Sequence, residues 1–301
     1  MQDLTGKVVV VTGAARGLGA ELARQLTARG ARVALLGLEP DELAAVSATC
    51  PGSAWWEVDV TDGPALHRVA TAVQADLGPA WGVVANAGIA VGGPLLLSDA
   101  ASYDRVVEVN LLGSIRTVRA FLPQVVESRG YVLQIASVAA LLPVPMMGAY
   151  CASKSGAEAF AHALRGEVKH HGVRVGVGYL SWTDTEMVRG ADRRTGLGDL
   201  RSTLPGALGR TYAVEPTVAR LVDGLARRAS RVYGQGWVRS LYWTRAVVPT
   251  LLAAAPAGRA REAEQRIRTA GPAATTPLGQ GGAADVRAGA YTPMAEKPPS
   301  T

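Results

Sequence analysis

The sequence predicts an α/β fold with a doubly wound parallel sheet, and three observations lead to this prediction. Short β-branched runs alternate with longer segments of helical periodicity over the first 180 residues. A glycine-rich turn lies between the first such run and the first helical segment. Apolar residues make up 48% of the 301-residue chain, which is enough to fill a substantial core. This alternation is typical of βαβ units, with helices on both faces of the sheet.

Six buried strands are expected, because each apolar run is short and ends in turn residues. They lie at residues 8–11, 32–36, 55–58, 82–85, 131–135 and 173–179. The helices between them are expected at residues 18–29, 41–49, 64–77, 103–126 and 149–169. Ligands of such sheets bind outside the carboxyl ends of the strands, where the strand order switches. The functional residues should therefore follow the strands.

The pattern loosens after residue 180. Residues 181–212 have no firm period, so we expect a loop with short helices there. A helix at about 215–228 and a short strand at 231–233 complete the main domain, which spans residues 1–236.

Two further segments follow this domain. Residues 237–269 form a basic and aromatic helical extension, with a helix expected at 258–268. Residues 270–301 consist mostly of Gly, Ala, Pro and Thr, a composition that predicts a disordered tail.

Positive charge is concentrated near the C-terminus. Residues 201–301 contain 14 Lys and Arg residues against 6 Asp and Glu residues, in a chain of net charge +6. A basic surplus can serve nucleic acid or an anionic membrane surface. Here it is almost all arginine, scattered along helix-like sequence, so we expect a solvated face and no nucleic acid partner. Contact of the extension with a membrane surface stays an alternative.

The two cysteines, Cys50 and Cys151, show no paired spacing. This argues against a disulfide framework and a cysteine-based zinc site, and it indicates a reducing compartment. No metal site is expected. The N-terminal residues lack the basic and apolar segments of a signal peptide. The longest uncharged stretch near the C-terminus, 246–258, has 13 residues, whereas a membrane-spanning helix needs about 20. We therefore expect a cytoplasmic protein.

Residues 12–19 read TGAARGLG and lie between the first strand and the first helix. Gly13 permits the tight turn, Gly17 lets the backbone approach a pyrophosphate at the helix N-terminus, and Gly19 allows close packing of helix on strand. An ordinary glycine-rich turn is the alternative, which the position after the first strand disfavours. We therefore predict a Rossmann-type dinucleotide site. Its expected contacts in this loop are Gly13, Ala15, Arg16, Gly17, Leu18 and Gly19.

The end of the second strand bears on the choice between NAD and NADP. A carboxylate there binds the ribose hydroxyls of NAD, whereas a basic residue accepts the 2′-phosphate of NADP. Gly37 and Leu38 occupy this position, and Arg16 can supply a positive charge. NADP(H) is therefore favoured over NAD(H), although Glu39 leaves NAD(H) open. The residues expected beside the adenine are Asp59 and Val60.

Tyr150 and Lys154 are four residues apart, so they share one face of the helix expected at 149–169. A phenol titrates near ~10 in water, which is too high for efficient proton transfer at neutral pH. A nearby ammonium favours the phenolate, and lowering the pKa by about three units takes roughly 4 kcal/mol. Ser137, after the strand at 131–135, is expected to orient the substrate oxygen. On its own, such a Tyr–Lys pair usually lies on the exposed surface of a helix. Together with Ser137 and the glycine loop, it indicates a catalytic site.

Together these motifs resemble the short-chain dehydrogenase/reductase family over about residues 4–235. The TGxxxGxG loop matches residues 12–19, and the YxxxK motif with its serine matches Ser137, Tyr150 and Lys154. The Asn-Ala-Gly element after the fourth strand matches residues 86–88, and the catalytic asparagine matches Asn110. One departure is Leu180-Ser181, where the family usually has Pro-Gly.

The resemblance implies that residues 1–236 are a dinucleotide-binding catalytic domain. It also implies that Lys154 binds the nicotinamide ribose, that Asn110 holds a water in a proton relay, and that Thr185 contacts the carboxamide. A homodimer or homotetramer through the helices carrying Asn110 and Tyr150 is expected. The remaining cofactor contacts that it implies are Asn86, Ala87, Gly88 and Tyr150.

The function implied is an NAD(P)(H)-dependent oxidoreductase that interconverts an alcohol and a carbonyl, with Tyr150 as general acid and base. Residues expected near the substrate are Leu141, Leu142, Val144, Met146, Met147, Trp182 and Met187, with Met146, Trp182 and Met187 as candidate contacts. They suggest a small apolar substrate, unless they simply pack the core. A non-catalytic dinucleotide-sensing regulator is the alternative, but it would not need all four catalytic residues. A serine hydrolase using Ser137 is disfavoured, since the glycines of a nucleophile elbow are missing.

Overall fold

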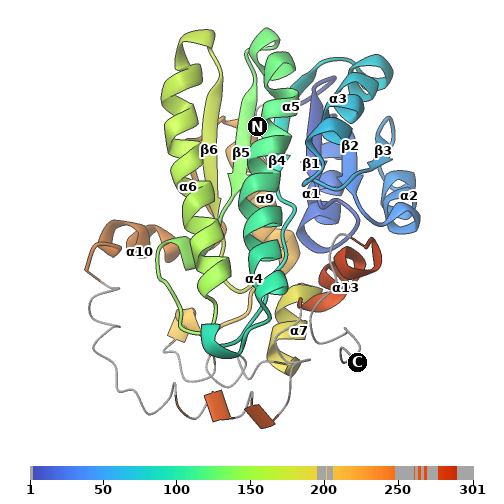
Figure 1. The fold of residues 1–301 in the computed structure, drawn as a ribbon. Coiled ribbons are helices and arrows are strands. Elements are labelled where there is room, and N and C mark those ends of the chain that lie inside the picture. The colour runs from blue at the N-terminus through green and yellow to red at the C-terminus, as the bar shows by residue number, and fades with distance from the viewer. Residues whose placement is uncertain are drawn as a thin grey trace.

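A parallel sheet of seven strands forms the centre of the structure, with the order β3-β2-β1-β4-β5-β6-β7 (Figure 1). The structure is a computed structural model, and it describes residues 3–194, 201, 206–247, 261, 264–265, 268–269 and 277–289. The strand order reverses between β1 and β4, so the carboxyl ends of these two strands border the crevice where ligands bind in such sheets. The predicted doubly wound α/β fold is confirmed.

Each predicted strand is present, with bounds that differ from the prediction by a few residues at most. The strands are β1 (Val8–Thr12), β2 (Arg32–Gly37), β3 (Ala54–Glu57), β4 (Ala80–Ala85), β5 (Tyr131–Ile135), β6 (Arg174–Tyr179) and β7 (Arg231–Tyr233). All residues of β1 and β5 are buried. Helices cover both faces of a parallel sheet, which explains why its strands are continuously apolar.

The helices form two layers around the sheet (Figure 1). One layer packs residues of α3, α5 and α6 on the sheet, and the other packs residues of α1, α2 and α9. The helices of the main domain are α1 (Gly17–Thr27), α2 (Pro40–Ala48), α3 (Gly63–Leu77), α4 (Ala100–Val107), α5 (Ser114–Glu127), α6 (Gly148–Val168), α7 (Glu186–Arg194) and α9 (Val214–Ala226).

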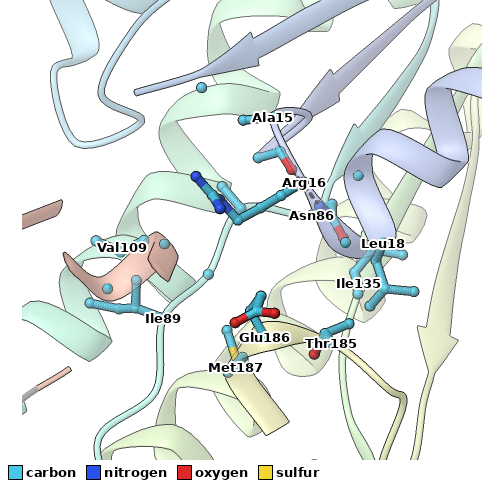
Figure 2. A pocket seen from close by; sticks show the side chains of 18 of the residues that line it. Ala15, Arg16, Leu18, Asn86, Ile89, Val109, Ile135, Thr185, Glu186 and Met187 are labelled. Atoms are coloured by element: carbon cyan, nitrogen blue, oxygen red, sulfur yellow. Dashed lines mark hydrogen bonds between the residues drawn. The ribbon is translucent and has the colours of Figure 1, made fainter. Parts of the chain in front are cut away.

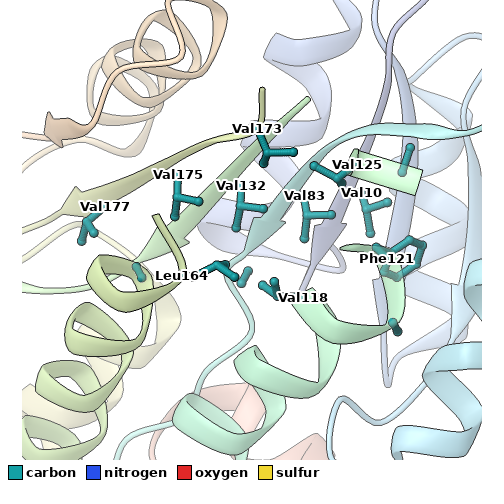
Figure 3. Packing of buried hydrophobic residues seen from close by; sticks show 14 of the residues in the cluster. Val10, Val83, Val118, Phe121, Val125, Val132, Leu164, Val173, Val175 and Val177 are labelled. Atoms are coloured by element: carbon teal, nitrogen blue, oxygen red, sulfur yellow. The ribbon is translucent and has the colours of Figure 1, made fainter. Parts of the chain in front are cut away.

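Valine side chains from neighbouring strands dominate the core beneath α5 and α6 (Figure 3). Val83 and Val132 project from β4 and β5 toward Phe121 of α5 and Leu164 of α6. Phe121 is fully buried in this layer. This packed core holds the carboxyl ends of the strands, where ligands bind in such sheets, in fixed positions.

The helix predicted at residues 103–126 is divided. α4 leads into a π-helix, η2 (Glu108–Gly113), which leads into α5. A π-turn holds one more residue than an α-turn and often occurs at functional sites. Here the widened turn carries Asn110, whose side chain is bound to the backbone of Ile89.

The C-terminal part differs from the sequence prediction. Within the predicted extension, α10 (Val238–Thr244) packs on the core beneath α6, while most of the helix expected at 258–268 lies outside the described residues. Within the predicted disordered tail, α13 (Gly279–Arg287) is an ordered helix beside α7 (Figure 1), and residues 270–276 and 290–301 lie outside the described residues. Leu278 and Asp285 are buried, which the composition of the segment does not reveal. Across the described chain, every helix is too short or too polar to cross a membrane.

Candidate active site

The glycine loop connects β1 to α1 at the switch in strand order. Gly13 has φ +65°, a left-handed conformation that favours glycine. A Cβ on Gly19 would overlap the carbonyl oxygen of Gly13, so only glycine allows this approach of helix to loop. The first N–H groups of α1 have no partners within the helix, and they suit an anion such as a pyrophosphate.

A cavity of about 240 Å³ opens in front of this loop (Figure 2). In Figure 2, Arg16 extends across the cavity from the loop, while Thr185, Glu186 and Met187 close the other side. Every cofactor contact predicted from the sequence lines the cavity. These residues are Gly13, Ala15, Arg16, Gly17, Leu18, Gly19, Gly37, Leu38, Asp59, Val60, Asn86, Ala87, Gly88, Tyr150, Lys154 and Thr185.

Asn86 joins the ends of β1 and β4. Its backbone N–H and that of Ala87 both donate to Oγ1 of Thr12 at 3.0 Å, and its side-chain amide donates to the carbonyl of Thr12 at 2.9 Å. These bonds hold the two strand ends together beneath the cavity. The side chain of Asn86 thus positions the loop.

Arg16 is ion-paired within the cavity, which the sequence did not predict. Its Nε donates to Oε2 of Glu39 at 2.9 Å, and a second nitrogen lies 3.2 Å from Oε1 of Glu42. The Glu39 side chain lines the cavity and is largely buried. The positive charge expected to attract a 2′-phosphate is therefore already balanced by carboxylates.

Ser137, Tyr150 and Lys154 line the same cavity, at the end that α6 and β5 form. Ser137 follows β5 and accepts a hydrogen bond from the backbone of Ala139. Nζ of Lys154 donates to the carbonyl of Ile135 at 3.1 Å and lies 5.8 Å from the centre of the Tyr150 ring. The hydroxyl, phenol and amine that the sequence predicted to meet do meet here.

The electrostatics of this group differ from the expectation. Burial raises the pKa of Tyr150 to about 12, although a hydrogen bond with Ser137 opposes the rise. Burial lowers the pKa of Lys154 to about 8. The sequence argument expected the ammonium to lower the pKa of the phenol, but desolvation dominates this pKa and the buried amine does not offset it. At neutral pH the phenol is therefore protonated.

Asn110 is fully buried and lies behind the cavity. Its amide nitrogen donates to the carbonyl of Ile89 at 2.9 Å and to Oγ of Ser153 at 3.1 Å, and its Oδ1 accepts from the N–H of Ile89 at 2.8 Å. Both of its amide hydrogens are thus engaged with protein atoms. In this arrangement Asn110 ties the segment after β4 to α6.

A second cavity of about 100 Å³ adjoins the first at Ser137 and Tyr150 and is mostly apolar. Of the residues expected near the substrate, Leu142, Val144, Met147, Trp182 and Met187 line it. Leu141 belongs to the core beneath α6.

Met146, a candidate substrate contact, lines neither cavity. Its backbone turns through φ +73°, and its carbonyl accepts from Gly93, which leaves the neighbouring Met147 to face the pocket. The sequence analysis missed Leu278, which lines both cavities from the far C-terminus.

The segment that departs from Pro-Gly is well anchored. The carbonyl of Leu180 accepts from Val138 at 2.8 Å, and the N–H of Ser181 donates to Oε1 of Gln235 at 2.8 Å. Thr185, further along, still reaches the cavity. The backbone path beside the site is therefore kept without these two residues.

Comparison with known proteins identifies the family. A family model described as short chain dehydrogenase matches residues 7–195, which is more than half of the chain. The chain belongs to the short-chain dehydrogenase/reductase family. It is accordingly an oxidoreductase, and the resemblance inferred from the sequence motifs is confirmed.

Individual relatives agree with this membership. The protein named SadH from Mycobacterium tuberculosis is 32% identical over 245 residues, covering 77% of this chain and 87% of SadH. A metagenomic short-chain oxidoreductase, solved in complex with NADP, is 36% identical with a TM-score of 0.56, covering 58% of this chain and 82% of its own. A short-chain dehydrogenase/reductase from Burkholderia phymatum, solved with NAD, has a TM-score of 0.72 at 23% identity, covers 84% of this chain and 97% of its own, and shares the fold.

Proposed function

We propose that this short-chain dehydrogenase/reductase interconverts a ketone or aldehyde and the corresponding alcohol, using a nicotinamide dinucleotide and Tyr150 as general acid and base. One observation carries the proposal: Ser137, Tyr150 and Lys154 line the same cavity as the glycine loop. The dinucleotide supplies or accepts the hydride at the carbonyl carbon. The protein places the carbonyl and handles the proton.

The protonation states suit carbonyl reduction. Because burial keeps the Tyr150 phenol protonated at neutral pH, its hydroxyl can donate a hydrogen bond, and then the proton, to the oxygen of a bound carbonyl. Ser137, which is hydrogen-bonded with Tyr150 here, can turn its single O–H to the same oxygen once the carbonyl is bound. The Lys154 amine, protonated below about pH 8, stabilises the phenolate that remains. Alcohol oxidation reverses these steps.

The glycine loop and the N-terminus of α1 fit the pyrophosphate of a dinucleotide, and the end of β2 fits its adenosine ribose. The preference for NADP(H) expected from Arg16 loses its basis, because Glu39 neutralises that side chain and would repel a 2′-phosphate. We therefore propose that NAD(H) is bound at least as well as NADP(H).

The pocket beside Tyr150 is apolar and small, which supports a small apolar substrate. The alternative, a regulator that senses dinucleotides without turnover, would use the same glycine loop. It gives no reason for Ser137, Tyr150 and Lys154 to line one cavity, or for Ser137 and Tyr150 to border the apolar cavity as well.

The test is Tyr150→Phe, which removes only the phenolic oxygen. We expect unchanged dinucleotide binding and at least ~100-fold slower turnover of ketones and aldehydes, the usual scale of acid–base catalysis. Turnover is followed at the NAD(P)H absorbance band, and binding by tryptophan fluorescence. Near-normal turnover of the variant refutes the role of Tyr150. Dinucleotide binding without turnover of any carbonyl by the unsubstituted protein indicates the regulator.

A further inference from the structure

The C-terminal segment 277–289 reaches back to the active site. Leu278 is 1% exposed, and its backbone N–H donates to the carbonyl of Ala90 at 2.9 Å. Residues of the segment line the cavity in front of the glycine loop, and Leu278 lines the second, apolar cavity as well. α13 is thus a wall of the site, although it begins more than 120 residues after Tyr150.

Besides the Leu278–Ala90 bond and a hydrogen bond from Arg16 to Gln280, two close contacts fix this segment. Gly279 packs against the backbone of α7 so closely that a Cβ on Gly190 would lie 2.8 Å from its nitrogen. Arg105 of α4, 4% exposed, holds the Asp285 carboxylate with Nη2 at 2.7 Å from Oδ1 and Nε at 3.0 Å from Oδ2. The same guanidinium binds Asp59, which lines the cavity in front of the glycine loop. A bidentate pair of this kind fixes orientation as well as distance.

Leu278 forms an apolar cluster with residues beside the catalytic tyrosine. The buried members are Ala90, Ala139, Met147, Cys151 and Leu278, and Tyr150, Trp182 and Met187 lie at its edge. A carbonyl whose oxygen meets Ser137 and Tyr150 would direct its substituents into the cavity that this cluster surrounds. The cavity measures about 100 Å³, so the size of the residue at position 278 limits the substituent.

We propose that Leu278 determines substrate specificity, by limiting the length of the apolar substituent on the carbonyl, and that the Arg105–Asp285 pair positions it. The proposal rests on the proposed function, because it assigns the apolar cavity to the substrate. The substrate class is a ketone or secondary alcohol with one short apolar substituent. Leu278 contacts that substituent, whereas Asp285 acts through the placement of α13.

The experiment measures kcat/KM for a series of methyl n-alkyl ketones of increasing chain length with saturating dinucleotide. Leu278→Ala removes three carbon atoms from the pocket wall. We expect its ratio of long-chain to short-chain kcat/KM to rise at least ~10-fold over the unsubstituted protein, since one methylene in an apolar pocket is worth about that much. Leu278→Phe should move the ratio the other way. Leu96→Ala is the matched control, because Leu96 is exposed and lines neither cavity.

Asp285→Asn tests the positioning role. If the ion pair aims Leu278, this variant loses discrimination between chain lengths, whereas a merely structural role lowers kcat/KM equally for all ketones. Leu278→Val, which removes one carbon atom, replaces Leu278→Ala should that variant not fold, and it should shift the ratio in the same direction by a smaller amount. Ketone binding followed by tryptophan fluorescence, to which Trp182 and Trp237 at the cavity contribute, must show the same shift without turnover.

An unchanged chain-length profile in folded Leu278 variants overturns the specificity proposal and leaves the proposed function intact. Absence of ketone turnover in the unsubstituted protein with either dinucleotide overturns the proposed function instead. The two failures are therefore distinguishable.

Discussion

Lys154→Met should make the protein more stable at neutral pH while it removes catalysis. The Lys154 amine is buried, and desolvation lowers its pKa from 10.5 to about 8 without an offsetting carboxylate among the described residues. This difference corresponds to about 3 kcal/mol of unfolding free energy at pH 7. Methionine avoids this cost but loses the hydrogen bond to Ile135, worth about 1 kcal/mol. The net expectation is a gain of about 2 kcal/mol.

The pH dependence gives the sharper test. Between pH 8 and 10.5 the unfolded chain holds the Lys154 proton while the folded protein has lost it, so the stability of the unsubstituted protein rises with pH. The free energy of unfolding of the unsubstituted protein therefore increases by about 2 kcal/mol between pH 7 and pH 9.5. This increase removes the stability advantage of Lys154→Met. Urea unfolding of both proteins at the two pH values measures this change. Lys169→Met, at an exposed position, is the control and should show no such trend. The reasoning is refuted if Lys154→Met is less stable than the unsubstituted protein by the same amount at both pH values.

Three further predictions concern other parts of the molecule. Glu39→Gln removes one of the two carboxylates paired with Arg16 and leaves Glu42, so the ratio of NADP(H) to NAD(H) affinity should rise about tenfold, measured by fluorescence titration; an unchanged ratio would show that the Arg16–Glu39 pair does not face the 2′-position of the bound ribose. Asp62→Ala removes the side chain that caps α3 at the N–H of Ala65, and urea unfolding should show a loss of about 1 kcal/mol with normal turnover. Phe121→Ala leaves a cavity between α5 and the sheet and should cost about 3–5 kcal/mol in the same assay, whereas a loss below 1 kcal/mol would mean that the core repacks.

Most of the sheet was predictable because its inner strands are buried on both faces, whereas the edge strand β3 is only half-buried. Runs such as those of β1 and β5 are apolar throughout, and the turns after them are marked by Gly13 and Ser137. The glycine loop, Tyr150 and Lys154 could be placed together because parallel strands bring their carboxyl ends to one edge. At these positions the apolar and turn residues of the sequence and the topology of the parallel sheet predict the same arrangement.

What the sequence did not reveal depends on contacts between distant residues. The order of α13 comes from the pairing of Asp285 with Arg105 and the burial of Leu278, and the composition of the tail carries no trace of either. The charge balance of Arg16 depends on the path of the chain around Glu39. The raised pKa of Tyr150 reflects desolvation, which spacing along a helix cannot express.

The π-helix at Glu108–Gly113 has a consequence for how this region tolerates change. Deleting one residue there would let α4 run into α5 as a continuous α-helix. Because the wide turn takes up the extra residue, the faces of α4 and α5 would keep nearly the same relative direction, so Arg105 and Phe121 would stay close to their present partners. The turn that carries Asn110 would narrow, and Asn110 would lose its place beside Ile89. A one-residue deletion in this segment should therefore impair turnover more than it lowers the free energy of unfolding.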